Sequence, residues 1–337
     1  QIKMSIKILQ PGLFSTIQDE GRIGYQDLGF SGAGALDFYS FKMAQKLIGN
    51  DGPAIEYTVI GPKVQFLKEN TFAFIGGTSN AKLNGNSIDS QVVYKVQTND
   101  VLEIGQVTEG ARGYLVFGHP LKIERIAESY STHTRSGLGG FEGRALKKHD
   151  IIPTQSNASY NENLGKATYY IPLVEDNTIH VIKGPQFSSF SEEAVDTFIN
   201  SEFKVSDQSD RMGYRLVGPS VSPLKTADII SEPVALGSIQ VPNDGNPIIL
   251  LNDKQTVGGY TKIATVTQLD LKKLAQLKPG ETIRFEWIST EEAFKQLIEF
   301  ENDFEQKLIN VSEQPLFNLS NVRNTSKKLA SLIKEDK

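Results

Sequence analysis

The chain has 337 residues, a formal net charge of −5 and no cysteine, and its length suits two domains better than one. Without cysteine it forms no disulfide, thiolate metal site or cysteine nucleophile. The mild charge, with no run rich in Lys and Arg, argues against a nucleic-acid partner. No apolar stretch approaches the roughly 18 residues of a membrane helix, and the start, QIKMSIKIL, contains no hydrophobic signal region. We therefore expect a cytoplasmic protein without a membrane partner, with Met4 as a candidate initiator.

Short segments rich in β-branched and aromatic residues predict strands along most of the chain. Gly, Asn, Asp or Pro residues separate these segments, as is typical of turns. The predicted strands are 71–77, 92–96, 101–105, 113–118, 168–174, 178–182, 247–251 and 282–288. Many short strands with turns between them indicate a mainly β fold of the sandwich or barrel type.

Helices are few and are predicted from apolar residues at a spacing of three to four. A Ser-x-x-Glu capping box at Ser189 precedes the second helix, and a second one at Ser289 precedes the longest. The predicted helices are 36–48, 191–199, 267–279 and a long one from 289. Beyond Ser312 the sequence turns polar and then offers a short amphipathic piece around Leu329 and Ile333.

The motif Arg-x-Gly-Tyr-x-x-x-Gly occurs twice, beginning at Arg22 and at Arg211. The polar stretch 154–167 lies between the copies and is the best linker candidate. We therefore predict two related β-barrel domains that share an internal repeat. The predicted boundaries are 4–155 for the first domain, 165–290 for the second and 291–337 for a helical C-terminal tail.

The densest group of polar residues surrounds the apolar strand 248–251. That strand runs into Asn-Asp-Lys-Gln-Thr and then Gly-Gly-Tyr, within residues 237–266. Such a segment brings backbone amides and polar side chains close to a ligand. An ordinary hairpin, in which Asx and Gly residues form the turn, explains the same residues about equally well.

The two motif arginines have two interpretations as well. An arginine held in a tight turn binds carboxylate or phosphate through two parallel hydrogen bonds, whereas a structural arginine pins loop carbonyls. The residues that flank the copies differ, with Asp19 near the first, and Asp210 and Arg215 near the second. Those differences are where we expect function to reside.

Other catalytic patterns are weak. The glycine-rich stretch 131–150 lacks the Gly-Lys-Ser/Thr ending of a phosphate loop. The four histidines are scattered without the spacing of metal ligands, so we infer no metal. No Gly-x-Ser-x-Gly motif supports a serine triad.

Taken together, these segments resemble the C subunits of 5-oxoprolinase, also called the KipA or allophanate-hydrolase subunit 2 family. The resemblance extends from about residue 6 to 288, in family order. It is carried by 18–25 (QDEGRIGY), 34–37 (GALD), 47–50 (LIGN), 61–62 (GP), 135–144, 209–216 (SDRMGYRL), 240–242 (QVP) and 253–260 (DKQTVGGY). The chain departs from the family pattern at Ala33, Leu36, Gln45, His119, His149, Val257 and Thr261. None of these departures removes a charged core residue of the pattern.

This resemblance implies two cyclophilin-like β-barrel domains. It also implies that the protein functions as one subunit of a complex. The C subunit pairs with a KipI-like B subunit, and together with the A subunit they hydrolyse 5-oxo-L-proline to L-glutamate using ATP. We therefore expect the C subunit of an ATP-dependent 5-oxoprolinase complex, which is active only with its partner subunits. Activation by ATP suits a lactam, because amides are poor electrophiles.

Two alternative functions stay open. The same fold serves as the carboxyltransferase domain of urea carboxylase, which implies biotin as the carboxyl carrier. This chain has no Met-Lys-Met biotin-carrier segment and no ATP-grasp signature, so that function would need separate subunits. A KipA-like protein would instead act as a regulator that binds a KipI-like inhibitor of a kinase.

We predict a cleft in which the segment after the second arginine meets the segment after strand 247–251, since loops converge at a barrel mouth. An arginine there would hold the substrate carboxylate, which 5-oxoproline has and urea lacks. Asp253 is the favoured general base or acceptor of the lactam N–H, although it could equally brace a turn. The predicted catalytic residues are Asp253, Asp210 and Tyr260, and the predicted substrate-binding residues are Arg211, Arg215, Gln240, Gln255, Asp37 and Arg22.

Overall fold

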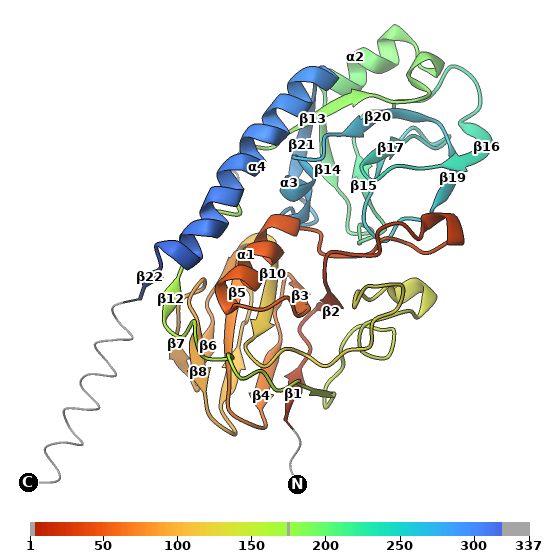
Figure 1. The fold of residues 1–337 in the computed structure, drawn as a ribbon. Helices are drawn as coiled ribbons and strands as arrows, with labels where there is room; N and C mark the ends of the chain where they lie inside the picture. The colour runs from red at the N-terminus through yellow and green to blue at the C-terminus, as the bar shows by residue number, and fades with distance from the viewer. Residues whose placement is uncertain (1–3, 174–175, 319–337) are drawn as a thin grey trace, which may run out of the picture.

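The computed structural model describes residues 4–173 and 176–318. Figure 1 shows two β-rich halves, with one long helix running along the outside of both. The amphipathic piece predicted around Leu329 and Ile333 lies outside the described residues.

The first half contains two antiparallel sheets that face each other. A six-stranded sheet has the order β11-β1-β4-β9-β6-β7, and a five-stranded sheet has the order β2-β3-β10-β5-β8. The bounds are β1 Ser5–Gln10, β2 Phe14–Gln18, β3 Ala54–Thr58, β4 Lys63–Phe66, β5 Asn70–Ser79, β6 Lys82–Leu83, β7 Asn86–Ser87, β8 Tyr94–Val96, β9 Val101–Glu103, β10 Val107–Phe117 and β11 Ile151–Pro153.

The five-stranded sheet is buried on both faces because its central strands are apolar at successive positions. In β5, Phe72 and Phe74 point to the core shared with the six-stranded sheet. Ala73 and Ile75 point to the opposite face, where the helices pack. Alternation along a strand sends neighbouring side chains to opposite faces, so the run TFAFI supplies two cores at once.

The second half is a closed barrel of seven strands in the order β13-β20-β17-β18-β15-β14-β21. Its pairs are antiparallel except β13 with β21, which is parallel. A two-stranded arm, β16 with β19, stands beside the barrel, and β12 pairs with β22. The bounds are β12 Lys166–Ala167, β13 Thr178–Lys183, β14 Glu202–Val205, β15 Gly213–Val217, β16 Asp228–Pro233, β17 Ser238–Gln240, β18 Ile248–Leu250, β19 Val257–Tyr260, β20 Lys262–Val266, β21 Thr282–Trp287 and β22 Leu316–Phe317.

Four α-helices occur in the described residues. Their bounds are α1 Phe38–Ile48, α2 Glu192–Asn200, α3 Leu271–Ala275 and α4 Thr290–Glu313, and short 3-10 helices are η1 Gln26–Leu28, η2 Thr134–Ser136 and η3 Phe187–Ser189. Asp37 caps α1, accepting from the backbone N–H of Ser40 at 3.1 Å. Ser289 caps α4 by accepting from Glu292 N–H, as the capping box predicts.

The predicted mainly β fold with few helices is confirmed, and three details differ. The first half forms two packed sheets in the described residues, whereas the second forms a closed barrel. The cap of α2 is Ser191 and not Ser189, which belongs to η3. The described part of the predicted strand 168–174 is not a strand. Apolar and polar residues do alternate in this segment, but Tyr170 packs against Phe304 of α4 and is not part of a sheet.

The two copies of the Arg-x-Gly-Tyr motif do not have the same local structure. Tyr25 lies just before η1, where Gly24 has a positive φ of 85°. Tyr214 lies inside β15, in the barrel wall. The two segments therefore differ in secondary structure after the arginine, and Arg22 and Arg211 are both buried.

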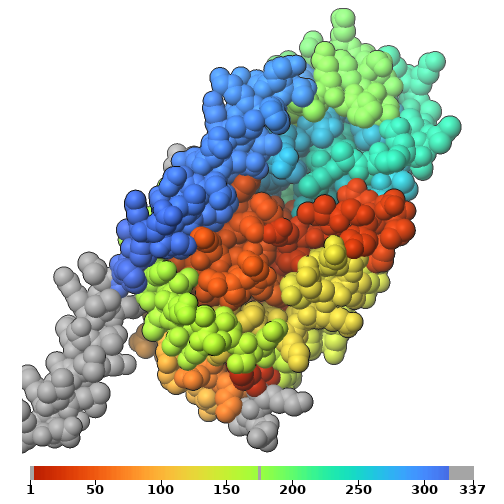
Figure 2. All heavy atoms as spheres, in the orientation of Figure 1, coloured from red at the N-terminus to blue at the C-terminus, as the bar shows by residue number. Residues whose placement is uncertain are grey.

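Polar contacts between the halves are numerous. Gln276 of the second half donates to the Asp37 carboxylate at 2.8 Å and to the carbonyl of Arg112 at 3.0 Å. Arg112 donates across the boundary to the Tyr214 hydroxyl at 2.6 Å. Figure 2 shows the red N-terminal segment between the yellow loop near residue 130 and the barrel. The two halves are therefore fixed to each other by buried hydrogen bonds.

Candidate functional site

A cleft lies on the outer face of the barrel wall, between strands β15, β17 and β18 and the arm strand β19. It has a volume of about 260 Å³. Five of the residues proposed for the site line this cleft; these are Asp210, Arg215, Gln240, Gln255 and Tyr260.

Local hydrogen bonds explain how the sequence places these residues. The Asp210 carboxylate accepts from Met212 N–H at 2.8 Å through Oδ1, which forms the tight turn into β15. Gln240 ends β17, and β19 crosses it at Gly258. A Cβ atom at Gly258 would lie 2.5 Å from Gln240 Nε2, so β19 packs directly against the Gln240 side chain.

The cleft carries more positive than negative charge. Arg135, Arg215 and Lys254 line it, and the carboxylate among its lining residues is that of Asp210. Gln240, Gln255 and Tyr260 supply neutral donors and acceptors. A concave site of this composition is suited to a small anion that also carries an amide-like group.

Two further cavities adjoin this central cleft. One, of about 460 Å³, has an apolar mouth that includes Leu28 and Phe30 and shares Lys254 and Gln255 with the central cleft. The other, of about 680 Å³, shares Arg215 and Tyr260 with it. No residue lines both outer cavities, so they meet the central cleft at different ends.

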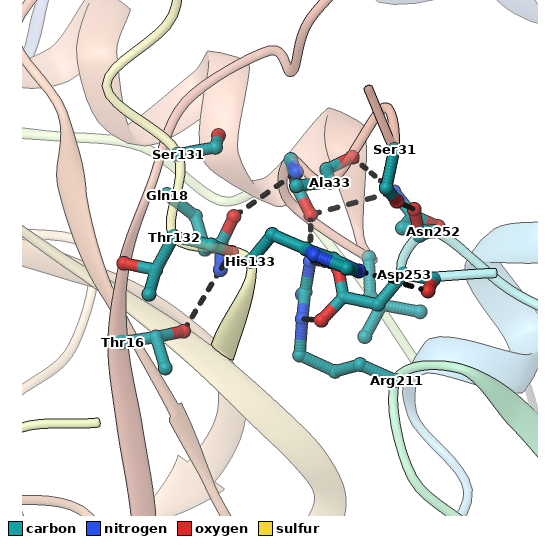
Figure 3. A network of polar contacts seen from close by, with 12 residues as sticks. Thr16, Gln18, Ser31, Ala33, Ser131, Thr132, His133, Arg211, Asn252 and Asp253 are labelled. Atoms are coloured by element: carbon teal, nitrogen blue, oxygen red, sulfur yellow. Dashed lines mark hydrogen bonds and ion pairs between the residues drawn. The ribbon is translucent and has the colours of Figure 1, made fainter. Parts of the chain in front are cut away.

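A buried ion-pair network lies behind the cleft (Figure 3). Arg211 donates through Nε and Nη2 to both oxygens of Asp253, at 3.1 and 3.0 Å. Its Nη1 lies 2.6 Å from Glu56 of the first half. Burial opposes the charge on Arg211, but Asp253 and Glu56 together raise its pKa above the usual value. All three side chains are buried, so the network joins the halves and is closed to solvent.

This network changes the roles that we predicted for Arg211 and Asp253. Every nitrogen of the Arg211 guanidinium is bonded within the protein, to Asp253, Glu56 and the Gly34 carbonyl. Neither Arg211 nor Asp253 is among the lining residues of the cleft. Arg215 therefore lines the cleft, whereas Arg211 does not.

Asp37 and Arg22 are also buried away from the cleft. Asp37 is the cap of α1, and burial raises its pKa against the hydrogen bonds from Ser40 and Gln276. Arg22 donates through Nε to the carbonyl of Ile126 at 3.1 Å. Burial lowers the pKa of Arg22, while the charges of Asp19 and Asp253 oppose that shift. Asp37 acts as a helix cap, whereas Nη1 and Nη2 of Arg22 are buried without a hydrogen-bond partner in the described part of the chain.

The similarity of the chain to known proteins identifies its family. The family profile of the carboxyltransferase domain, subdomain A and B, matches residues 28–287. The chain belongs to this family. The resemblance to the C subunit of 5-oxoprolinase is also confirmed, since the chain is 34% identical to that protein of Escherichia coli over 303 residues. The match covers 89% of this chain and 97% of the relative.

Larger relatives contain the same unit. Urea amidolyase of Saccharomyces cerevisiae is 33% identical over 313 residues, which cover 85% of this chain and 17% of the relative. The solved urea amidolyase of K. lactis superimposes with a TM-score of 0.83 at 29% identity. That match covers 91% of this chain and 20% of the other. The family fold therefore occurs both as a separate chain and within longer enzymes.

Sequence reasoning missed one residue that lines the cleft, Lys254. Its side chain is only 7% exposed, and it lines both the central cleft and the apolar cavity. In the described residues its ammonium group has no hydrogen bond and no ion pair, and burial lowers its pKa. Its place between Asp253 and Gln255 made it look like one more turn residue, and the available signal was a lysine that directly follows an apolar strand.

Two negative findings apply to residues 4–173 and 176–318. No group of three or more His, Asp or Glu side chains is arranged to hold a metal ion there. No helix in the same ranges is long and apolar enough to cross a membrane.

Proposed function

We propose that this chain is the C subunit of an ATP-dependent 5-oxoprolinase complex, which hydrolyses 5-oxo-L-proline to L-glutamate. The match to the C subunit of 5-oxoprolinase over nearly the whole of both chains supports this function. The structural observation that carries the proposal is the cationic cleft, where Arg215 lies beside Gln240 and Tyr260. This set fits a small ring that bears one carboxylate and one amide.

Each cleft residue has a role that follows from its chemistry. Arg215 binds the carboxylate of the substrate with its two-pronged guanidinium. Gln240 and Tyr260 hydrogen-bond the lactam and fix the orientation of its carbonyl. Asp210 uses Oδ1 for the turn at Met212 and Gly213, so Oδ2 can accept the lactam N–H. In this arrangement Asp210 replaces Asp253 as the acidic residue of the site.

ATP belongs to the complex and not to a loop of this chain. The glycine-rich stretch predicted as a weak phosphate-loop candidate packs on itself. A Cβ atom at Gly139 would lie 2.1 Å from the carbonyl oxygen of Ser131, and one at Gly143 would lie 2.0 Å from that of Gly137. These glycines make room for protein backbone, so they do not fit a nucleotide phosphate. We therefore assign ATP binding to the A and B subunits, with which this chain would act.

The test is a coupled assay of 5-oxoproline loss and ATP hydrolysis in the reconstituted three-subunit assembly. The chain alone should show no turnover. Arg215→Met should raise the KM for 5-oxoproline by roughly 10-fold or more, as expected for loss of a charge-assisted contact. The matched control is Arg284→Met, which removes an exposed arginine on strand β21, paired with Glu202, and should leave KM unchanged. Turnover by the isolated chain at the rate of the assembly contradicts the proposal.

Carboxyl transfer is the second candidate function, because the matching family is a carboxyltransferase domain and the K. lactis superposition is close. A biotin carried by a separate protein would then deliver its carboxyl group to an amide in the same cleft. Biotin-dependent carboxylation of urea without any 5-oxoproline turnover, in an assembly with its partner subunits, would select this function over the first.

A further inference from the structure

Lys254 has a largely buried stem and an ammonium group without a protein partner among the described residues, in a cleft that already has Arg215 for a substrate carboxylate. In the described residues its Nζ contacts no acceptor, although 93% of the side chain is removed from solvent. The buried lysine on the neighbouring strand is different, because Lys262 is paired with Glu232 at 2.6 Å. The ammonium group of Lys254 therefore reaches the cleft on a largely buried stem, where it can bind an anionic group of a ligand.

Lys254 and Arg215 lie at different ends of the central cleft. Lys254 borders the cavity with the apolar mouth, and Arg215 borders the cavity on the other side. Those outer cavities have no lining residue in common, so the two cations border different neighbouring cavities. The cleft therefore offers two separate positions for negative charge.

We propose that Lys254 binds a second anionic group of the ligand, so that the cleft holds a short dicarboxylate by both ends. This inference rests on the proposed function, in which a lactam with one carboxylate becomes an open acid with two. Arg215 would hold the carboxylate that is present throughout. Lys254 would bind the carboxylate that arises from the lactam carbonyl when the C–N bond is broken by water, with the nitrogen leaving as the amine.

This role explains why Lys254 has no protein partner before the reaction. The carbonyl oxygen of a lactam is neutral, and negative charge reaches it only as the ring opens. A cation at that point interacts more strongly with the opening state than with the substrate, which is the requirement for accelerating a reaction. A carboxylate of the protein beside Lys254 would cancel this effect, and none lies within ion-pair distance among the described residues.

The probes are L-glutamate and L-glutamine, which have the same shape and differ in the charge of the side-chain end. We expect the full-length chain to bind L-glutamate more tightly than L-glutamine in isothermal titration calorimetry. In Lys254→Met the preference should fall by roughly 10-fold or more, the size of a charge-assisted contact. Arg215→Met should weaken both ligands and keep the preference, and Lys204→Met, at an exposed position on β14, should change neither.

Stability separates this role from a structural one. Lys254→Met removes a cation that has no protein partner among the described residues, so its melting temperature should equal or exceed that of the wild type. A preference that changes less than 10-fold in Lys254→Met, or a wild type without preference, overturns the proposal. Turnover of 5-oxoproline by the reconstituted assembly is measured in parallel. Its absence rejects the proposed function, and a glutamate preference that depends on Lys254 still establishes the second anion position.

Discussion

Asp253 and Lys254 are adjacent in the sequence, and their side chains serve different purposes. Asp253 turns inward to Arg211, and Lys254 lines the cleft. A turn sequence such as Asn-Asp-Lys-Gln-Thr shows which residues are polar, but the direction of each side chain depends on the φ and ψ angles of the turn. The segment proposed from the sequence does line one cleft, together with Asp210, Arg215, Gln240 and Tyr260. The sequence could not divide neighbouring residues into those facing the cleft and those facing the core.

His119 is a residue for which burial has a consequence that depends on pH. It stacks on Tyr160 with ring centroids 4.0 Å apart, and its Nδ1 accepts from Asn157 N–H at 3.0 Å. Burial lowers its pKa, with a small opposing effect from Glu69. The unfolded chain therefore binds more protons than the folded one between the lowered folded pKa and the usual value near 6.5.

The free energy of unfolding should consequently fall as the pH drops through this window, and stay level above it. His119→Asn removes the titrating ring, so its stability should vary less with pH between 7.5 and 5 than that of the wild type. Urea unfolding at both pH values measures the difference. His149→Asn, at an exposed position, is the matched control and should retain the wild-type pH dependence. An identical pH dependence in His119→Asn and wild type would contradict the assignment.

Among the elements, α4 shows how sequence periodicity can locate a helix without locating its partner. The capping box and the apolar stripe predicted this helix correctly. Phe304 is buried against Tyr39 of α1, with ring centroids 5.0 Å apart, and against Tyr170 at 5.7 Å. Phe294, on the same stripe, is 63% exposed. A helical pattern reports which side is apolar, and only the fold determines how much of that side is covered.

Phe304→Ala should therefore destabilise the protein by about 3 kcal/mol, the usual cost of emptying a buried aromatic site. Phe294→Ala is the matched control on the same helix, and its effect should stay within about 0.5 kcal/mol. Urea denaturation followed by circular dichroism measures both. Equal losses in the two variants would mean that α4 does not dock through its C-terminal half.

For the whole molecule, the important residues are those that connect the two halves. Leu36 comes from the first half, yet its side chain belongs to the core of the barrel. Arg211 comes from the second half and pairs with Glu56 of the first. Such contacts were beyond prediction from one sequence, because local patterns contain no information on which distant residue completes a buried pair. The two-part architecture could be predicted, whereas the way in which the parts are joined could not.

Asp253→Asn tests the joining network. This change leaves the buried Arg211 with one carboxylate partner instead of two, and breaking buried pairs of this kind costs about 3 kcal/mol. We expect a lower melting temperature and, below it, 5-oxoproline turnover by the reconstituted assembly within a few-fold of wild type. The control is Asp196→Asn, an exposed residue of α2. An unchanged melting temperature together with a 100-fold loss of turnover, as for loss of a general base, would return Asp253 to the catalytic residues.

The pair between Arg211 and Glu56 also bears on how the protein is made. The two residues are 155 positions apart in the chain, and a ribosome adds about 5–20 residues per second. Arg211 therefore leaves the ribosome roughly 8–30 seconds after Glu56, and the ion pair cannot form before then. During that time the first half can form its sheets, but the surface that later contacts the barrel carries a carboxylate and the apolar side chain of Leu36 without their final partners. Slow elongation across the second half should prolong this exposed state and make the nascent chain depend more on chaperones.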